Sequence, residues 1–410
     1  MVRQEWGRVL AALFHRLGQL ELAEDALQDA FVAALSTWPQ QGVPANSCGW
    51  LLRTAERKAI DILRRGQVFR NRRQQLAVLA ELDSIPDTDC QAEPVEFPDD
   101  RLKLIFTCCH PALTQPVSVA LTLKTVCGLN TPQIARAFLV PESTMAQRIV
   151  RAKRKISLAG IPYQIPPPEL WPERMQAVLA VIYFIFNEGY SALEGPAHAR
   201  IDLCEEAIHL GRLVAQLAPN EAEASGLLAL MLLHHSRRES RAGPAQEIVP
   251  LNTQDRQQWD RDCIEEGLGC IGRSRALSER PGSYTLQAML SAIHATAPSF
   301  GETDWNAMLA VYDQILAQSA NPVVLVNRAV AVSYASGPQQ GLEALQRLEI
   351  EPRIANYQPY HAARADMLAR QGQVEAAARA YRRAIELSHN EAEQAFLNKK
   401  LCELPGEPAP

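Results

Sequence analysis

Thr131–Ile156 (TPQIARAFLVPESTMAQRIVRAKRKI) contains two helical patterns separated by a short turn at residues 139–141. Thr131 and Pro132 favour the start of the first helix, as an N-cap and as a proline in the first turn. In the second helix, Glu142–Ile156, apolar side chains recur at helical spacing. They are Met145, Ile149, Ala152 and Ile156. A short helix, a tight turn and a longer helix with one apolar stripe predict a helix-turn-helix.

The other face of this second helix is polar and basic. Side chains at the start of such a helix can reach base edges in the major groove, and later Lys and Arg side chains contact phosphates. A basic helix on an ordinary surface would not need the turn spacing and the caps, so the pattern favours DNA binding. The candidate contacts are Ser143, Thr144, Gln147, Arg148, Arg151 and Lys155.

Another amphipathic helix is predicted at Ala23–Leu35 (AEDALQDAFVAAL). Asp25, Gln28, Asp29 and Val32 lie opposite its apolar stripe. On its own, this segment has the pattern of an ordinary surface helix. The predicted stripe consists of Ala23, Leu27, Ala30, Phe31, Ala34 and Leu35.

A loop, Trp38–Ser47, leads into a basic helix, Gly49–Arg65. Residues 51–75 contain eight Arg or Lys against two acids. This excess of one sign after a rigid loop suits phosphate contact and the holding of an unstacked strand better than a solvated face. The candidate nucleic-acid contacts are Asn46, Arg53, Thr54, Arg57, Lys58, Arg64 and Arg65.

The formal net charge of −5 hides a strong segregation of charge. Residues 1–75 carry 11 basic and 7 acidic side chains, residues 76–100 carry eight acids and no Lys or Arg, and residues 101–160 carry nine bases and one acid. The rest of the chain is net acidic. Two basic segments separated by an acidic linker indicate that the N-terminal part of the chain binds a polyanion.

The predicted domains are 1–75, 101–160 and 173–410. They are joined by the acidic linker 76–100 and by the linker 161–172, whose five prolines favour a stiff, extended joint. Helical periodicity dominates elsewhere, and alternation of apolar and polar residues never persists between turns. The predicted fold class is therefore all-α.

These segments resemble a known family. AEDALQDAFVAAL and WLLRTAERKAIDILRR are similar to region 2 of extracytoplasmic-function (ECF) RNA polymerase sigma factors. STMAQRIVRAKRKI is similar to the recognition helix of their region 4, T-V-K-S-R-L-x-R-A-R. FTCCHPAL, FNEGYSA and NPVVLVNRAVAV resemble the ECF subgroup with a tetratricopeptide-like C-terminal extension. Matches to the region 4 pattern are Thr144, Arg148, Arg151, Ala152 and, conservatively, Lys153, whereas Met145, Ala146 and Gln147 depart from it.

The resemblance implies a protein with no catalysis and no cofactor of its own, which binds core RNA polymerase and promoter DNA. Asp25, Gln28 and Asp29 would dock on the clamp helices of the beta-prime subunit. The candidate contacts between Asn46 and Arg65 would open and hold the −10 element, and those between Ser143 and Lys155 would read the −35 element. The acidic linker would run through the active-site cleft and the RNA exit channel.

The C-terminal part shows repeat patterns. Residues 360–390 fit one tetratricopeptide unit, residues 304–345 fit parts of two more, and residues 201–236 form a fainter helix pair. Such repeats stack and leave a concave face, on which a regulatory protein would bind. The expected packing positions of the first unit are Ala365, Leu368, Gly372, Ala377, Tyr381 and Ala384.

Two other function classes stay open from the residues alone. One is a conventional regulator with one helix-turn-helix, which would bind a palindrome as a dimer. The other is a scaffold or enzyme within the repeats, for which Asp255–Gly267 (DRQQWDRDCIEEG) is the nearest candidate active site. A salt-bridged surface between domains is the preferred interpretation of that segment. No P-loop, nucleophile elbow or zinc-protease motif is present.

Metal binding and membrane insertion are not expected. The adjacent Cys108 and Cys109 lack the spacing of structural zinc ligands, so core packing is the preferred interpretation. His234, His235 and His294 lack partners at ligand spacing. The longest apolar run, Ala177–Phe186, is short of the roughly 20 residues of a membrane span. The N-terminus has no signal-peptide pattern, so a cytoplasmic protein is expected.

Overall fold

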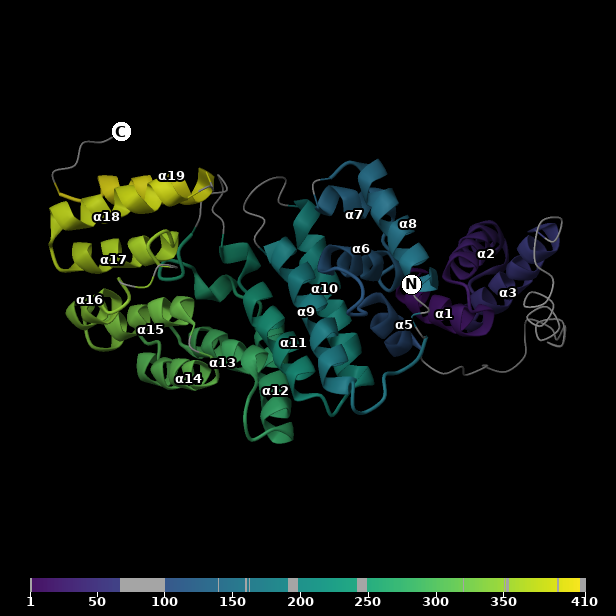
Figure 1. Ribbon diagram of the computed structural model, residues 1–410, viewed down its shortest axis with the longest axis horizontal. Helices are drawn as coiled ribbons and strands as arrows, with labels where there is room; N and C mark the ends of the chain where they lie inside the picture. Colours follow the sequence, from purple (N-terminus) through teal and green to yellow (C-terminus); the bar gives the residue numbers. More distant parts are fainter. Residues whose placement is uncertain are drawn as a thin grey trace. The chain divides into compact units, whose positions relative to one another are not determined.

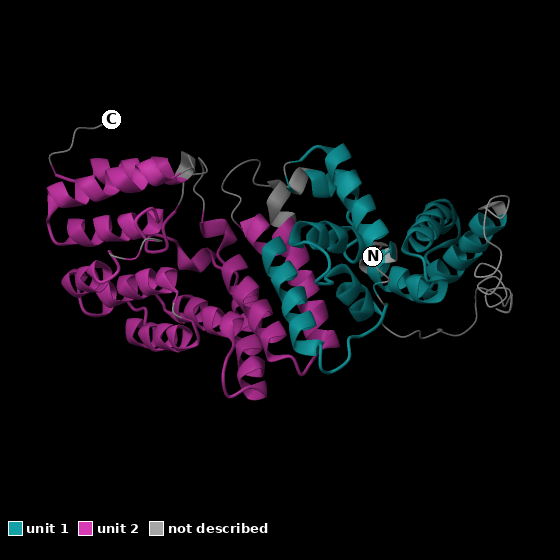
Figure 2. Cartoon of the chain, viewed as in Figure 1, with its two compact units in different colours: residues 1–185 teal, residues 186–410 magenta. Residues whose placement is uncertain are grey.

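The computed structural model describes residues 2–66, 100–138, 140–158, 161, 163–190, 198–241, 249–319, 321–349, 351, 354–388 and 391–405. All regular secondary structure in these ranges is helical (Figure 1), which confirms the all-α prediction. The chain forms two compact units, Met1–Ile185 (unit 1) and Phe186–Pro410 (unit 2) (Figure 2). The finer domain boundaries stay predictions, and the acidic linker 76–100 lies outside the described residues except for Asp100.

In unit 1, the helices α2 and α3 pack together through small side chains. Ala23 and Ala30 on α2 and Ala55 and Ala59 on α3 are fully buried. The prediction that Leu35 belongs to the apolar stripe of α2 is wrong, because its side chain is 75% exposed. The helices of unit 1 are α1 (Val2–Leu17), α2 (Leu20–Gln41), α3 (Ser47–Gly66), α5 (Arg101–Cys108), α6 (Gln115–Thr125), α7 (Thr131–Ala137), α8 (Glu142–Leu158) and most of α9 (Trp171–Tyr190).

The loop between α2 and α3 is shorter than the predicted Trp38–Ser47. Helix α2 continues through Pro39 to Gln41. Pro39 has no N–H to donate to the carbonyl of Leu35, and the helix ends two residues after it. Gly42 then ends the helix with a φ of 85°, in the left-handed region that favours glycine, and its N–H donates to the carbonyl of Trp38.

Helices α7 and α8 lie where the helix-turn-helix was predicted. The N-cap, however, is Asn130 and not Thr131. The N–H of Gln133 donates to Oδ1 of Asn130 at 2.8 Å, and the N–H of Asn130 donates to Oε1 of Gln133 at 2.9 Å. This reciprocal pair satisfies two backbone donors at once, which a lone threonine hydroxyl cannot do. The stripe of α8 is confirmed, because Met145, Ile149, Ala152 and Ile156 are all buried.

The adjacent cysteines at the end of α5 pack in the core of unit 1. Cys108 and Cys109 are 0% and 2% exposed. Sγ of Cys109 lies 3.6 Å from Oγ1 of Thr122 on α6, and burial raises the pKa of its thiol to about 12. A buried thiol of that pKa remains protonated at neutral pH, which agrees with the core-packing interpretation.

The proline-rich segment 161–172 belongs to unit 1. The hydroxyl of Tyr163 donates to the carbonyl of Ala11 at 2.8 Å, and its ring lies 4.3 Å from that of Phe14. Helix α9 begins at Trp171, whose ring meets Phe106 edge-on at 5.3 Å. The division between the units therefore falls within α9 and not within the proline-rich segment.

Unit 2 is a succession of helices in which chain neighbours pack on one another. Helix α11 is buried nearly all round, including Leu227, Leu230 and Leu233, as expected for a helix that is apolar on every side. The helices of unit 2 are α10 (His198–Leu217), α11 (Ala222–His235), α12 (Arg261–Leu277), α13 (Ser283–Thr296), α14 (Trp305–Gln318), α15 (Pro322–Ala335), α16 (Pro338–Gln346), α17 (Gln358–Arg370), α18 (Val374–Leu387) and α19 (Glu391–Cys402), with two short 3₁₀ helices, η1 (Arg238–Ser240) and η2 (Arg256–Gln258).

Helices α17 and α18 form a hairpin at the predicted repeat. Gly372, with a φ of 75°, lies in the turn between them. Leu368 and Tyr381 are buried with the small residues Ala365, Ala377 and Ala384 in one apolar cluster. The tetratricopeptide identity of this hairpin stays a prediction. Among the described residues, no helix combines the length and the apolarity that a membrane span requires.

Candidate polymerase and promoter interfaces

The side of α2 that faces away from the buried stripe carries acidic and apolar side chains together. Asp25, Gln28 and Asp29 are exposed, as predicted from the sequence. Val32 and Leu35, one and two turns further along, are 66% and 75% exposed. These five residues, hereafter the α2 outer face, recur at helical spacing. Two large apolar side chains held in water beside two carboxylates are typical of a surface that contacts another protein.

Most of this surface follows from the sequence pattern, which predicts Val32 on the same side of the helix as Asp25 and Asp29. Leu35 does not, because the pattern includes it in the apolar stripe. The packing of α2 on α3 shows that Leu35 points to solvent, while Ala23 and Ala30 are buried as predicted.

Helix α3 presents the predicted basic face. Arg57 and Arg64 are exposed, and Arg53, Thr54 and Lys58 are half-buried. The side chain of Arg65 lies outside the described residues. The opposite side of α3 packs in the core of unit 1 through the buried residues Leu51, Leu52, Ala55, Ala59 and Leu63.

Asn46 has a structural contact that was not predicted. Its side-chain Oδ1 accepts a hydrogen bond from the N–H of Gly49 at 2.9 Å, which satisfies one of the free donors at the start of α3. An asparagine that caps a helix in this way is oriented by the backbone. Its proposed role at the −10 element therefore rests on the resemblance alone.

A buried ion pair joins α3 to α1. Arg16 contacts Glu56, whose side chain is only 5% exposed. Burial raises the pKa of the Glu56 carboxyl, and the Arg16 guanidinium opposes that rise. A buried carboxylate needs such a partner, so this contact fixes the orientation of α3 and of its basic face.

Helix α8 exposes most of the predicted −35 contacts. Ser143, Gln147, Arg151 and Lys155 are exposed, and Thr144 and Arg148 are half-buried. The six lie opposite the buried stripe, so the first turns of α8 are available to a groove and the later ones to phosphates. Nζ of Lys155 also donates to the carbonyl of Ala112 in the turn before α6.

A second ion pair joins α8 to α2. Lys153 contacts Glu24, and the two side chains are 14% and 5% exposed. Lys124 on α6 is close enough for the Glu24 charge to oppose the lowering of its pKa by burial, while Lys153 adds to that lowering. Glu24 on α2 thus lies near two lysines, Lys153 on α8 and Lys124 on α6. It links the helix that carries the α2 outer face to the helix-turn-helix.

Further contacts hold α1 against α6. Nε1 of Trp6 donates to the carbonyl of Thr125 at 3.2 Å. A side chain at Gly7 would place its Cβ only 2.5 Å from the carbonyl oxygen of Val126, so the two backbones meet at this glycine. The predicted −10 and −35 surfaces are therefore parts of one packed unit. Nothing in the sequence pattern had indicated these contacts.

The charged stretch Asp255–Gly267 in unit 2 is a set of caps and ion pairs. Asp260 accepts from the N–H of Cys263 at the start of α12 and pairs with Arg238 at 2.9 Å. Glu266 accepts two hydrogen bonds from Arg212, at 2.8 and 2.6 Å. These ion pairs lie within unit 2. The stretch therefore stabilises the packing of helices inside this unit and is not a surface between domains.

Three histidines of unit 2, His234, His235 and His294, are neutral at neutral pH. Burial lowers the pKa of His234 to about 3, and nearby Arg237 and Arg241 add to the effect. Burial likewise lowers the pKa of His235 and of His294 to about 4. Among the described residues, no three His, Cys, Asp or Glu side chains are grouped so that they could hold a metal ion.

Two known protein families match the two predicted DNA-binding regions in the N-terminal part of the chain. "Sigma-70 region 2" matches residues 1–68, which contain α1 to α3, and "Sigma-70, region 4" matches residues 103–156, which contain the helix-turn-helix. "Family of unknown function (DUF6596)" matches residues 174–275.

Two relatives extend these matches. A protein of Rhizobium meliloti (strain 1021), described as uncharacterized, is 39% identical over 406 residues, covering 98% of this chain and 94% of its own. "Probable ECF RNA polymerase sigma factor SigI" of Mycobacterium tuberculosis is 28% identical over 156 residues, covering 38% of this chain and 53% of its own. With sigma-70 regions 2 and 4 both matched and a probable ECF sigma factor among the relatives, the chain belongs to the extracytoplasmic-function family of RNA polymerase sigma factors.

Proposed function

We propose that this chain binds core RNA polymerase through the α2 outer face and directs it to promoters. The observation that carries the proposal is the exposure of Asp25, Asp29 and Leu35 on one side of α2, opposite a stripe that is fully packed. A basic clamp surface with apolar patches on the polymerase would complement this face. In this role the chain has no catalysis of its own and acts in the cytoplasm, where polymerase and chromosome are.

The DNA contacts are proposed for two faces. The basic face of α3, with Asn46, would hold the opened −10 element, because Arg and Lys side chains beside a packed helix suit a single strand. The exposed positions of α8 from Ser143 to Lys155 would read the −35 element in the major groove. The proposed −10 contacts are Asn46, Arg53, Thr54, Arg57, Lys58, Arg64 and Arg65.

The contacts between α2 and α8 must open on a promoter. Elements at −10 and −35 are roughly 25 base pairs apart, or about 85 Å at 3.4 Å per base pair. A compact unit of this length has a radius of gyration of only about 16 Å. The two DNA-binding faces cannot reach both elements while α2 and α8 stay packed. The packed unit is therefore the free form, and binding to polymerase would separate its two halves.

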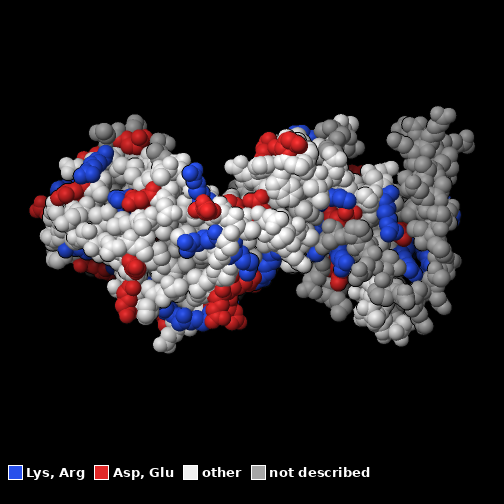
Figure 3. Space-filling view, turned by 90° about the horizontal axis from the view of Figure 1, so that it is seen from below, with Lys and Arg blue, Asp and Glu red and all other residues white. Residues whose placement is uncertain are grey.

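Unit 2 is proposed to control promoter access from within the same chain, or to offer its repeats to a regulatory protein. Its excess of acid over base fits electrostatic attraction to the basic DNA-binding helices. On the face drawn in Figure 3, however, acidic and basic side chains alternate in small groups along the C-terminal half. We therefore favour control of promoter access by specific docking of unit 2 on the DNA-binding helices over control by a uniformly negative electrostatic potential.

Transcription in vitro with purified core polymerase tests the proposal. Core enzyme alone should give no promoter-specific transcript, and addition of this chain should give one with a defined start site. A dimeric regulator would act only on an already assembled holoenzyme. Failure to associate with core polymerase, measured in the same preparation by gel filtration, would falsify the assignment of the α2 outer face.

A further inference from the structure

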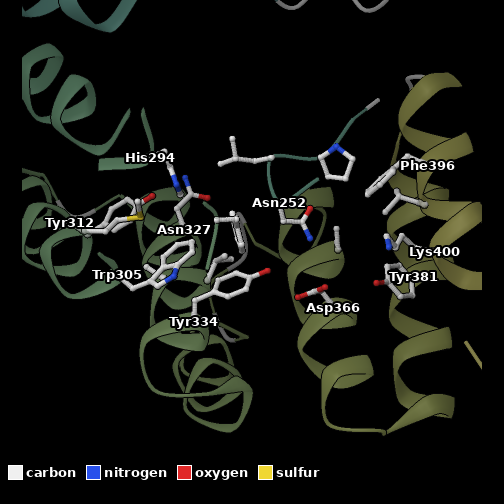
Figure 4. A pocket seen from close by; sticks show the side chains of 18 residues that line it. Asn252, His294, Trp305, Tyr312, Asn327, Tyr334, Asp366, Tyr381, Phe396 and Lys400 are labelled. Carbon is white, nitrogen blue, oxygen red and sulfur yellow. The ribbon is translucent and has the colours of Figure 1, made fainter. Parts of the chain in front are cut away.

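Unit 2 contains a cavity of about 370 Å³ that is partly open to solvent. It lies among α13, α14, α15, α17, α18 and α19, under the turn at residues 250–252 (Figure 4). Pockets for small organic ligands measure about 300–1,000 Å³ and combine apolar walls with a few convergent polar groups. This cavity has both properties, and nothing in the polymerase or promoter contacts uses it.

One wall of the cavity is aromatic. The rings of Trp305 and Tyr334 are stacked at 4.6 Å with an interplanar angle of 17°. Phe300 meets both of them edge-on, at 5.3 and 5.1 Å. His294 lies 5.4 Å from Trp305 and is neutral, because burial lowers its pKa to about 4. The wall offers a flat ligand several aromatic faces and edges, and the Arg370 guanidinium lies 4.3 Å from the centroid of the Tyr334 ring.

The opposite side carries one charge of each sign. Asp366 projects into the cavity from α17 and Lys400 from α19, with the Tyr381 side chain from α18 beside them (Figure 4). Asp366 is paired with Arg370 of its own helix at a long 3.5 Å, and Lys400 with Glu403 of its own helix at 2.7 Å. Among the described residues, Asp366 and Lys400 do not form an ion pair with each other across the cavity.

Several neutral polar groups around the cavity have hydrogen-bonding capacity to spare. Within the described part of the chain, the side-chain amides of Asn252 and Asn327 and the hydroxyl of Tyr381 form no hydrogen bond. Nδ1 of His294 is buried and also has no partner among the described residues. Asn252 and Asn327 are exposed, so their amides are open to a ligand, whereas a buried polar atom such as Nδ1 of His294 is normally satisfied and here indicates room for a hydrogen-bonding partner.

We propose that this cavity binds a free aromatic amino acid. The ring lies against Trp305, Tyr334 and Phe300, the α-ammonium group pairs with Asp366, and the α-carboxylate pairs with Lys400. The charges at that end of the cavity are balanced, so a ligand with one charge of each sign meets both without adding a net charge. A simple amine can pair only with Asp366, and a simple acid can pair only with Lys400. A bare ring desolvates both charges at a cost.

Isothermal titration calorimetry on the full-length chain tests the proposal. The probes are L-tryptophan, L-phenylalanine, tryptamine, which lacks the carboxylate, and indole-3-propionate, which lacks the ammonium group. At least one of the two amino acids is expected to bind about tenfold or more tightly than either singly charged analogue, since each loses one charge-assisted contact. Absence of binding by both amino acids at millimolar concentration contradicts the proposal, as does equal binding of an amino acid and the two analogues.

Two variants and two matched controls locate the site. Asp366→Asn and Lys400→Gln should each weaken amino-acid binding about tenfold and reduce discrimination against the analogue that lacks the corresponding group. Asp313→Asn on α14 and Lys399→Gln on α19 change the same residue types outside the cavity lining and should bind normally. Normal binding by Asp366→Asn or Lys400→Gln overturns the assignment. The readout is binding alone, so its result is independent of the proposed role in transcription.

Discussion

Lys153 on α8 and Glu24 on α2 form an ion pair in which both side chains are largely buried. One partner belongs to the predicted −35 recognition helix and the other to the helix that carries the α2 outer face. A buried carboxylate left without its cation is strongly unfavourable. This single contact therefore couples the state of the helix-turn-helix to the state of region 2.

A double-mutant cycle should measure this coupling. Glu24→Gln and Lys153→Met are each expected to lower the free energy of unfolding of unit 1 by about 1–3 kcal/mol, and the double variant by less than their sum, with a coupling of about 1 kcal/mol or more. Urea denaturation of the full-length chain gives the values. Glu21→Gln, an exposed acid on the same helix, is the control and should change stability by less than about 0.5 kcal/mol. Strict additivity would mean that the pair does not link the helices.

The α2 outer face predicts a selective loss of polymerase binding. Asp25→Arg with Asp29→Arg should leave thermal unfolding unchanged, because both side chains are exposed, and should abolish association with core polymerase. Reversal of charge creates repulsion where complementarity is needed. The control is Asp262→Arg with Glu265→Arg on α12, which reverses two exposed acids in unit 2. Wild-type affinity in the α2 variant would remove the proposed docking face.

The exposed side of α8 predicts unequal effects of two arginines. Arg148→Ala should reduce promoter-specific transcription more than Arg154→Ala, because a good base contact is worth about 1–3 kcal/mol of discrimination whereas a phosphate contact mainly changes the salt dependence. Transcription from the cognate promoter and from one with an altered −35 element, at several salt concentrations, separates the two effects. Equal, mild losses from both variants would point to nonspecific backbone binding.

The buried histidines predict that unit 2 is sensitive to acid. His234 has a folded-state pKa of about 3, and His235 and His294 of about 4, all below the ordinary value of about 6.5. Groups with a lowered folded pKa contribute stability above the unfolded pKa and lose it as the pH falls toward the folded one. The melting temperature of unit 2 should therefore fall between pH 7 and pH 4, and His235→Gln should flatten this dependence. A melting temperature independent of pH in this window would contradict the burial of these side chains as neutral groups.

Control by unit 2 predicts a difference between the whole chain and a truncated one. The truncation should end after Tyr190, so that α9 is kept whole, because Trp171 and Arg174 of α9 pack on Phe106 of unit 1. The truncated chain is expected to fold and to differ from the full-length protein in promoter-dependent activity at matched concentration. Identical activity at every salt concentration would leave the repeats as a docking platform for another protein.

The sequence predicted the elements whose signals are local. The apolar stripe and exposed face of α8 follow directly from 3.6-residue periodicity, and so does the exposure of Asp25 and Asp29. The end of α2 differs from the prediction because a proline in a helical pattern usually marks a loop, whereas α2 continues through Pro39 for two more residues. The cap of α7 was misplaced because Thr131 was considered without Asn130, whose partner Gln133 lies three residues on.

The long-range contacts could not be predicted from local patterns. Glu24 and Lys153 are 129 residues apart, and neither differs in type from the exposed charges around it. Leu35 has the same ambiguity, since its exposure depends on which side of α2 the helix α3 covers. In the same way, the cavity in unit 2 collects Trp305, Asp366 and Lys400 from helices whose spacing along the chain carries no signal.

Helix α9 also has a consequence for the order of events during protein synthesis. Unit 1 is completed only by residues up to Ile185, including Arg174, whose Nη2 donates to the carbonyl of Phe106 at 2.6 Å. Chains grow at about 5–20 residues per second and their N-terminal domains fold first. The helix-turn-helix therefore leaves the ribosome before α9, the helix that covers Phe106, has emerged. For a few seconds the nascent chain exposes this ring and its neighbours, and a rare-codon pause just before Trp171 would prolong that exposure.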